Sequence, residues 1–267
     1  MRNPSVVRPA ITAAAVFMLL ASGCTSARSG AGAPEPPRPA TATTGSTFVI
    51  VHGAWGGSWD WRTVDSLLTA QGHRVHRPDL TGLGKRVHLA APDIGLATHA
   101  ADVINEILWE QLDNVVLVGH SYGGMVISAV ADSLGGRIRE LVYLDALLPR
   151  SGESAAVLLG GPDFERSVAA STRGGMIVPA WVTPDDTIPH DVPHPLRTLT
   201  DTVTLGARFA SVPGRYILTV EPDQQPDRFQ PFADRAAARG WPVVTMQGDH
   251  VPERSQPEAL VRVLLAR

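Results

Sequence analysis

A run of aliphatic residues, 115–118, ends at Gly119-His-Ser-Tyr-Gly123 and is followed at once by the helix-like segment 125–132. A Gly-x-Ser-x-Gly pentapeptide alone occurs often by chance, but the order of strand, tight turn and helix is the context that the motif requires. Glycines remove side chains where such a turn crowds its neighbours. A helix starting after Ser121 directs backbone N–H groups and a positive dipole end at the hydroxyl. The segment therefore predicts a nucleophile elbow with Ser121 as the nucleophile.

Residues 1–24 have the layout of a bacterial export signal. Arg2 and Arg8 precede an apolar run over residues 10–20, which is too short to span a bilayer as a permanent helix. Cys24, the single cysteine, follows Leu-Ala-Ser-Gly and resembles the end of a lipobox, although a lipobox prefers Leu where Ala21 stands. We expect lipid attachment at Cys24 and a membrane-anchored lipoprotein, with an ordinary secretory signal as the alternative. In either case we expect export from the cytoplasm.

Residues 25–46 are mainly Ser, Gly, Ala, Pro and Thr, with hardly a large apolar side chain. Such a segment cannot bury enough surface to offset the entropy of ordering, so we expect a flexible linker. Residues 47–267 suffice for one domain with a core. The chain has 23 basic and 26 acidic residues and a net charge of −3, without a basic cluster after the signal. Nucleic acid is therefore not an expected partner.

Short apolar runs alternate with amphipathic segments along residues 47–267. This alternation predicts the α/β class: a mostly parallel sheet with helices on both faces. The predicted strands are residues 47–52, 73–78, 115–118, 138–145, 215–220 and 241–246, and the predicted helices are 59–71, 97–111, 125–132, 227–239 and 257–266.

The alternation stops between residues 147 and 213. This stretch is rich in Pro and Gly, contains scattered Trp181, His190 and His194, and shows no strong strand. An irregular insertion of that length in a compact domain is usually functional or disordered. We therefore predict a cap inserted over the active site.

A serine hydroxyl is a poor nucleophile until a base takes its proton, so the elbow requires a histidine. In folds with this elbow the chain order is serine, then acid, then histidine. Of the nine histidines only His250 follows the last predicted strand, in the loop before the final helix. His250 is therefore the predicted base. His190 and His194 could face the pocket from the cap, or lie in solvent.

Three carboxylates are candidates for the acid that orients the histidine. Asp223 is preferred, because it lies just past the predicted strand 215–220. Glu221 lies two residues earlier and competes with it. Asp145, at the end of the strand that follows the elbow helix, is the third candidate, since some related hydrolases place their acid there. Each of them could instead be a loop-capping carboxylate.

An oxyanion formed at Ser121 needs backbone donors. One is the N–H after the nucleophile, here Tyr122, and the second comes from the loop after the first strand. In His52-Gly-Ala-Trp-Gly-Gly57 the glycines allow a tight turn that aims N–H groups inward, and Ala54 is the predicted second donor.

These motifs resemble the α/β-hydrolase superfamily, and they are most similar to its branch of plant methylesterases, hydroxynitrile lyases and bacterial carboxylesterases. The resemblance covers nearly all of residues 47–267 except the cap. It implies an α/β-hydrolase fold, Ser121 as nucleophile, His250 as base, and Ala54 and Tyr122 as oxyanion donors. One departure is at the acid, because an ungapped comparison puts Pro222 where the plant members have Asp. The motifs are residues 52–61, 80–84, 119–124, 143–149 and the pair Asp249-His250.

The expected activity is hydrolysis of a small or aryl carboxylic ester, or of a lactone, through an acyl-enzyme. Hydroxynitrile lyases of the branch have Lys directly after the histidine, whereas this chain has Val251, so a lyase-like enzyme is a weaker alternative. A second alternative is a non-catalytic lipoprotein that uses the fold to bind a ligand. No metal or organic cofactor is expected, because no His, Cys and Asp cluster has ligand spacing.

Overall fold

The computed structural model describes residues 45–183, 187–221 and 227–266. Within these residues, six parallel strands form the central sheet. Parallel neighbours need crossover connections, and here helices supply them. In spatial order the strands are β2 (Arg74–His76), β1 (Thr47–Val51), β3 (Val115–His120), β4 (Ile138–Leu144), β8 (Gly214–Val220) and β9 (Val243–Gln247).

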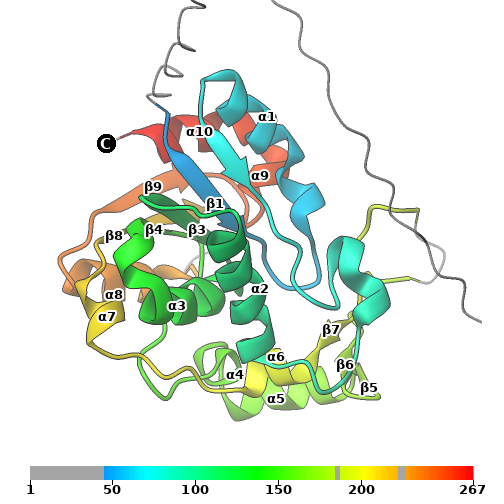
Figure 1. Cartoon of the computed structure of the whole chain (residues 1–267). Coiled ribbons are helices and arrows are strands. Elements are labelled where there is room, and N and C mark those ends of the chain that lie inside the picture. Colours follow the sequence, from blue (N-terminus) through cyan, green and yellow to red (C-terminus); the bar gives the residue numbers. More distant parts are fainter. Residues whose placement is uncertain (1–44, 184–186, 222–226, 267) are drawn as a thin grey trace, which may run out of the picture. The chain divides into compact units, whose positions relative to one another are not determined.

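Helices cover both faces of the sheet (Figure 1): α1 (Arg62–Ala70) and α10 (Pro257–Leu265) on one, and α2 (Leu96–Trp109), α3 (Gly123–Leu134) and α8 (Gln230–Ala238) on the other. Val116 and Val118 of β3 pack in the core with α1 and α10, whereas Val115 and Leu117 pack in the core on the opposite face. Successive side chains of a strand point to opposite faces, so a continuous aliphatic strand fills two cores. The predicted α/β architecture is confirmed.

The predicted elements end within a few residues of the observed ones, with two informative differences. The predicted helix over 59–71 begins as a short 3₁₀ turn, η1 (Ser58–Trp61), before α1. The predicted strand over 73–78 shortens to β2, ending before Pro78, which has no N–H to donate to a ladder. The other short helices outside the insertion described next are η2 (Gly84–Leu89), η3 (Gly135–Arg137) and α9 (Pro252–Ser255).

The segment predicted as a cap lies between β4 and β8 and contains small elements only (Figure 1). Its strands form an antiparallel three-stranded sheet, which the sequence did not suggest because each strand is two residues long. In chain order the elements are α4 (Ala155–Leu158), α5 (Pro162–Ala169), β5 (Thr172–Arg173), β6 (Met176–Ile177), β7 (His194–Pro195), α6 (Leu196–Thr200) and α7 (Ala207–Ser211).

The predicted signal peptide, Cys24 and residues 25–44 of the predicted linker lie outside the described residues. Among the helices that the structure does describe, none combines the length and the apolar character needed to cross a bilayer.

Candidate active site

Ser121 lies on the turn between β3 and α3 with a φ of 53°, a left-handed conformation that is rare outside glycine. Two glycines make this turn possible. A Cβ at Gly119 would lie 2.8 Å from the carbonyl oxygen of Gly123, and a Cβ at Gly123 would lie 2.6 Å from that of Val51. Real Cβ atoms essentially never come that close to another heavy atom. The predicted elbow is therefore present in the structure, with both of its glycines required.

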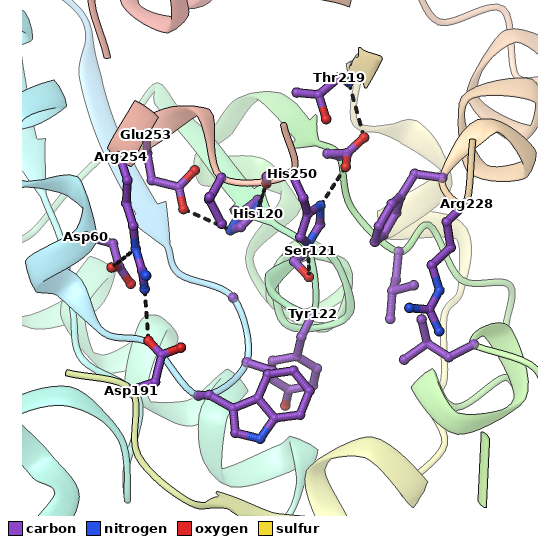
Figure 2. A pocket seen from close by; sticks show the side chains of 18 of the residues that line it. Asp60, His120, Ser121, Tyr122, Asp191, Thr219, Arg228, His250, Glu253 and Arg254 are labelled. Carbon is purple, nitrogen blue, oxygen red and sulfur yellow. Dashed lines mark hydrogen bonds and ion pairs between the residues drawn. The ribbon is translucent and has the colours of Figure 1, made fainter. Parts of the chain in front are cut away.

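Hydrogen bonds join Ser121, His250 and Asp145 in a row, and Figure 2 shows the contact between Ser121 and His250. Oγ of Ser121 lies 3.0 Å from Nε2 of His250, and Nδ1 of His250 lies 2.6 Å from Oδ2 of Asp145. When Nδ1–H donates to the carboxylate, Nε2 has the lone pair that accepts from the serine hydroxyl. The three residues follow β3, β4 and β9. A parallel sheet places the carboxyl ends of its strands at one edge, and the row forms there.

Asp145 is 2% exposed, and its second oxygen accepts a hydrogen bond from the Thr219 N–H at 3.2 Å. Burial raises the pKa of its carboxyl, while the hydrogen bond to His250 and the charge of that ring oppose the rise. A buried carboxylate with a bond on each oxygen holds one orientation, which fixes the imidazole that it faces.

The structure changes the order of the acid candidates. Asp223, preferred from the sequence, lies outside the described residues, whereas Nδ1 of His250 is paired with Asp145. Nδ1 has a single hydrogen to donate, so Asp145 replaces Asp223 as the carboxylate of the row. Glu221 lines the same pocket. Nothing in the local sequence separates Asp145 from Asp223, because each follows a predicted strand.

The two predicted oxyanion donors belong to residues that line the pocket at Ser121, Ala54 and Tyr122. Among the described residues, neither backbone N–H has an acceptor in the protein. The hydroxyl of Tyr122 bonds to Nδ1 of His99 at 3.0 Å. Two unpaired backbone donors beside a serine hydroxyl can stabilise a tetrahedral oxyanion.

Behind His250 lies a buried pair that the sequence reasoning missed (Figure 2). His120 donates from Nε2 to the carbonyl oxygen of His250 at 2.7 Å, and its Nδ1 lies 3.3 Å from Oε1 of Glu253. Burial lowers the pKa of His120 well below its usual value and raises that of Glu253 to about 8. Both shifts favour the uncharged forms, so the contact between the two side chains is a neutral one. The signal was the position of His120, which directly precedes the nucleophile.

The pocket at Ser121 has a volume of about 410 Å³. The insertion contributes Trp181 and Asp191 to its wall, and the ring of Phe229 stacks on that of His250 with centroids 4.6 Å apart. Further apolar lining comes from Trp55, Leu147, Leu159, Phe164 and Leu199. Within the part of the chain that the structure describes, no three or more His, Cys, Asp or Glu side chains are grouped so as to hold a metal ion.

Arg254 joins the insertion to the rest of the domain at one side of the pocket (Figure 2). Its Nε donates to Oδ1 of Asp60 at 2.5 Å and its Nη2 to Oδ1 of Asp191 at 2.9 Å. The guanidinium also lies over the ring of Trp59, 4.5 Å from its centroid. One cation thus holds two carboxylates from different parts of the chain.

The histidines of the insertion occupy different surroundings. His194 is fully buried beside Trp55, whereas Nδ1 of His190 bonds to the carbonyl oxygen of Asp191 at 2.7 Å. His190 lines a separate cavity, away from Ser121.

The family model described as "Alpha/beta hydrolase family" matches residues 48–263. The chain belongs to this family. As an alpha/beta hydrolase it has a structural neighbour in an extracellular alpha/beta-hydrolase from a Paenibacillus species, with a TM-score of 0.70 and 22% identity over 83% of this chain and 99% of that one. That similarity is one of fold.

Two relatives of this alpha/beta hydrolase have names that describe an activity. The carbendazim hydrolyzing esterase of a Nocardioides species is 52% identical over 114 residues, 43% of this chain and 47% of that protein. Methylesterase 1 of Arabidopsis thaliana is 33% identical over 114 residues, 42% of this chain and 43% of its own length. The chain thus spans less than half the length of these relatives. Their names confirm the resemblance to the methylesterase and bacterial esterase branch.

Proposed function

We propose that this alpha/beta hydrolase is a serine carboxylesterase. The observation that supports this most directly is the row Ser121–His250–Asp145, with contacts of 3.0 and 2.6 Å, at a strand–turn–helix elbow. His250 takes the proton of the Ser121 hydroxyl as Oγ attacks the ester carbonyl, and Asp145 stabilises the imidazolium that forms. The N–H groups of Ala54 and Tyr122 bind the oxyanion.

Collapse of the tetrahedral intermediate breaks the bond to the alcohol oxygen, which receives the proton from His250. The acyl group is then bonded to Oγ of Ser121. A water molecule, deprotonated by the same imidazole, attacks this ester, and the carboxylic acid leaves as Ser121 regains its proton. The row thus serves both halves of the reaction.

The proposed substrates are small esters with an apolar or aromatic group. A pocket of about 410 Å³ lined by Trp55, Phe164, Trp181 and Phe229 fits such a group. The relatives' names, a carbendazim hydrolyzing esterase and a methylesterase, support hydrolysis of esters. Val251 after the base argues against lyase chemistry. An intact hydrogen-bonded row argues against the alternative of a lipoprotein that only binds a ligand.

We further propose that the enzyme is exported and anchored through a lipid on Cys24. The support is the sequence of residues 1–24. Metabolic labelling with an alkyne fatty acid in a bacterial host tests it. The wild-type chain should incorporate the label and fractionate with membranes, and Cys24→Ala should do neither. A labelled Cys24→Ala chain contradicts the anchor.

Reaction with a fluorophosphonate probe tests the esterase proposal. The wild-type protein should be labelled and should hydrolyse p-nitrophenyl acetate and butyrate, and Ser121→Ala should lose both properties. Ser66→Ala is the matched control, because Ser66 is an exposed serine on α1. A wild-type protein that neither reacts with the probe nor cleaves these esters is not a serine esterase.

A further inference from the structure

Trp55, next to the proposed oxyanion donor Ala54, has an unusual backbone. Its φ is 63°, and the N–H of Gly56 donates to the carbonyl oxygen of Ala54 at 2.8 Å, closing a three-residue turn around Trp55. A positive φ is an outlier for a bulky residue, and this kind of turn is rare. Such a conformation persists where the surrounding structure fixes it. The surroundings of Trp55 therefore bear on where the Ala54 N–H points.

The insertion holds Trp55 by both of its backbone polar groups. The Trp55 N–H donates to Nδ1 of His194 at 3.2 Å, and the Trp55 carbonyl oxygen accepts from the Val192 N–H at 2.9 Å. His194 begins β7 and Val192 lies two residues before it, and both are well over a hundred residues farther along the chain than Trp55. The loop that presents Ala54 is thus fixed by a long-range contact.

The hydrogen bonds of His194 define its tautomer. The hydroxyl of Thr198 donates to the carbonyl oxygen of Pro195 at 2.7 Å, so Thr198 Oγ1 accepts from Nε2–H of His194, at 2.6 Å. With the hydrogen on Nε2, Nδ1 keeps the lone pair that the Trp55 N–H needs. His194 is fully buried, which lowers its pKa well below the usual value. The ring is therefore a neutral acceptor toward Trp55.

The second oxyanion residue meets the same ring. Tyr122 packs edge-on against His194 with centroids 5.1 Å apart, and the Trp55 ring lies 5.7 Å from it. Tyr122 is anchored on its other side by the bond of its hydroxyl to His99. His194 thus touches Tyr122, whose N–H is one proposed oxyanion donor, and Trp55, which directly follows the other donor, Ala54.

We infer that His194 is a positioning residue of the insertion: its Nδ1, through the Trp55 N–H, holds the turn that aims the Ala54 N–H at the oxyanion. The inference rests on the proposed esterase function. It assigns to the insertion a part in stabilising the transition state, beyond forming a wall of the pocket.

Asn and Leu have the same branched shape, and this makes them a matched pair at position 194. His194→Asn keeps an acceptor, Oδ1, near the place of Nδ1, and His194→Leu has none. With p-nitrophenyl butyrate we expect His194→Leu to lower kcat about 10- to 100-fold and to leave KM within about twofold. This fall in kcat is somewhat smaller than the one caused by removing an oxyanion donor itself. His194→Asn should restore most of that kcat.

A trifluoromethyl ketone supplies a readout that a merely structural role would not change. It forms a hemiketal with the serine whose oxyanion occupies the same site, so its Ki should rise in His194→Leu by about the factor by which kcat falls. Equal kcat losses in the Asn and Leu variants, or a raised KM with unchanged kcat, would overturn the inference.

If His194→Leu does not fold, Thr198→Val replaces it in the test. This substitution removes the acceptor of Nε2–H and allows the other tautomer, whose Nδ1–H opposes the Trp55 N–H. We expect a kcat loss of about tenfold with KM unchanged and a parallel rise in the ketone Ki. Wild-type kcat and Ki in a folded Thr198→Val protein would count against the inference. Wild type and Ser121→Ala are measured alongside, so an inactive wild type contradicts the esterase proposal instead.

Discussion

Nε2 of His120 lies 2.7 Å from the backbone carbonyl oxygen of His250. The residue that precedes the proposed nucleophile therefore supports the backbone of the proposed base, and Glu253 faces its other ring nitrogen. Three residues from two distant segments form one buried contact behind the reactive atoms. The contact is neutral, so its persistence depends on Glu253 keeping its proton.

Stability should depend on pH through Glu253. Its pKa rises from 4.5 to about 8 in the folded protein. Between these values the folded state holds a proton that the unfolded state has released, so the free energy of unfolding falls as the pH rises through this window. Glu253→Gln removes the ionisation and keeps the shape. The denaturation midpoint of wild type should therefore fall relative to that of the variant between about pH 5 and about pH 9.

Glu258→Gln is the control, because Glu258 is an exposed carboxylate on the neighbouring helix α10. Its midpoints should follow those of wild type at every pH. If the Glu253→Gln curve also runs parallel to wild type, Glu253 does not titrate in this range.

Among the three acid candidates, Asp145 should dominate catalysis. Asp145→Asn keeps the size of the side chain but loses the carboxylate at Nδ1, and we expect kcat to fall about 10²- to 10⁴-fold. Asp223→Asn and Glu221→Gln should stay within about fivefold of wild type, since Asp145 is the carboxylate paired with Nδ1 of His250. Steady-state kinetics on one ester compares all three. A larger loss in Asp223→Asn than in Asp145→Asn would restore the original preference.

Arg254→Gln should destabilise the protein more at neutral than at acidic pH. Burial raises the pKa of Asp60, and the bonds and charge of Arg254 oppose that rise. Without the guanidinium, burying an ionised Asp60 carboxylate without its cation costs folding free energy. Burying the protonated carboxyl costs less. Denaturation at about pH 4 and about pH 8 measures the difference.

Asp191→Asn serves as the comparison, since it weakens the contact of Arg254 with the insertion but leaves the Asp60 bond in place. Its effect on stability at neutral pH should be smaller. Identical pH profiles for Arg254→Gln and Asp191→Asn would show that Asp60 is not the group that responds.

Gly123→Ala should destabilise the elbow, because the added Cβ would lie 2.6 Å from the carbonyl oxygen of Val51. Overpacking of this kind costs about 1–3 kcal/mol, and each kcal/mol lowers the Tm by about 2–4 °C in a domain of this size. Gly136→Ala is the control, since a Cβ there meets nothing within 4 Å. The Tm of Gly136→Ala should match or slightly exceed that of wild type. An equal fall in Tm in both variants would mean that small shifts of the neighbouring atoms relieve the close contact at Gly123.

Patterns within short segments predicted the fold and two of the three residues of the row, Ser121 and His250. The strand at residues 115–118 and the elbow after it are local features, and His250 is singled out by its place after the last strand. Asp145 could not be chosen over Asp223 from local pattern, because both follow strands. The choice depends on register: β4 pairs with β8 so that the Asp145 N–H reaches the carbonyl oxygen of Ile217 at 2.8 Å.

The contact of His194 with Trp55 could not be predicted from the local sequence. A single histidine in an irregular stretch has no periodicity that says what it touches, and its partner Trp55 is 139 positions away. The two-residue strand that carries it is too short to show alternation. Contacts of this kind come from how the insertion packs, which only the three-dimensional structure reveals.

The bond between Ser121 and His250 joins residues 129 positions apart, which follow β3 and β9 of an all-parallel sheet in which β4 and β8 lie between those strands. Contacts between such distant positions form slowly, because a long loop must close first. During refolding, helical circular dichroism should therefore return before reactivity toward the fluorophosphonate does. The reactivity of Ser121 toward the probe would then report when the sheet is complete, because a partly folded chain would not react.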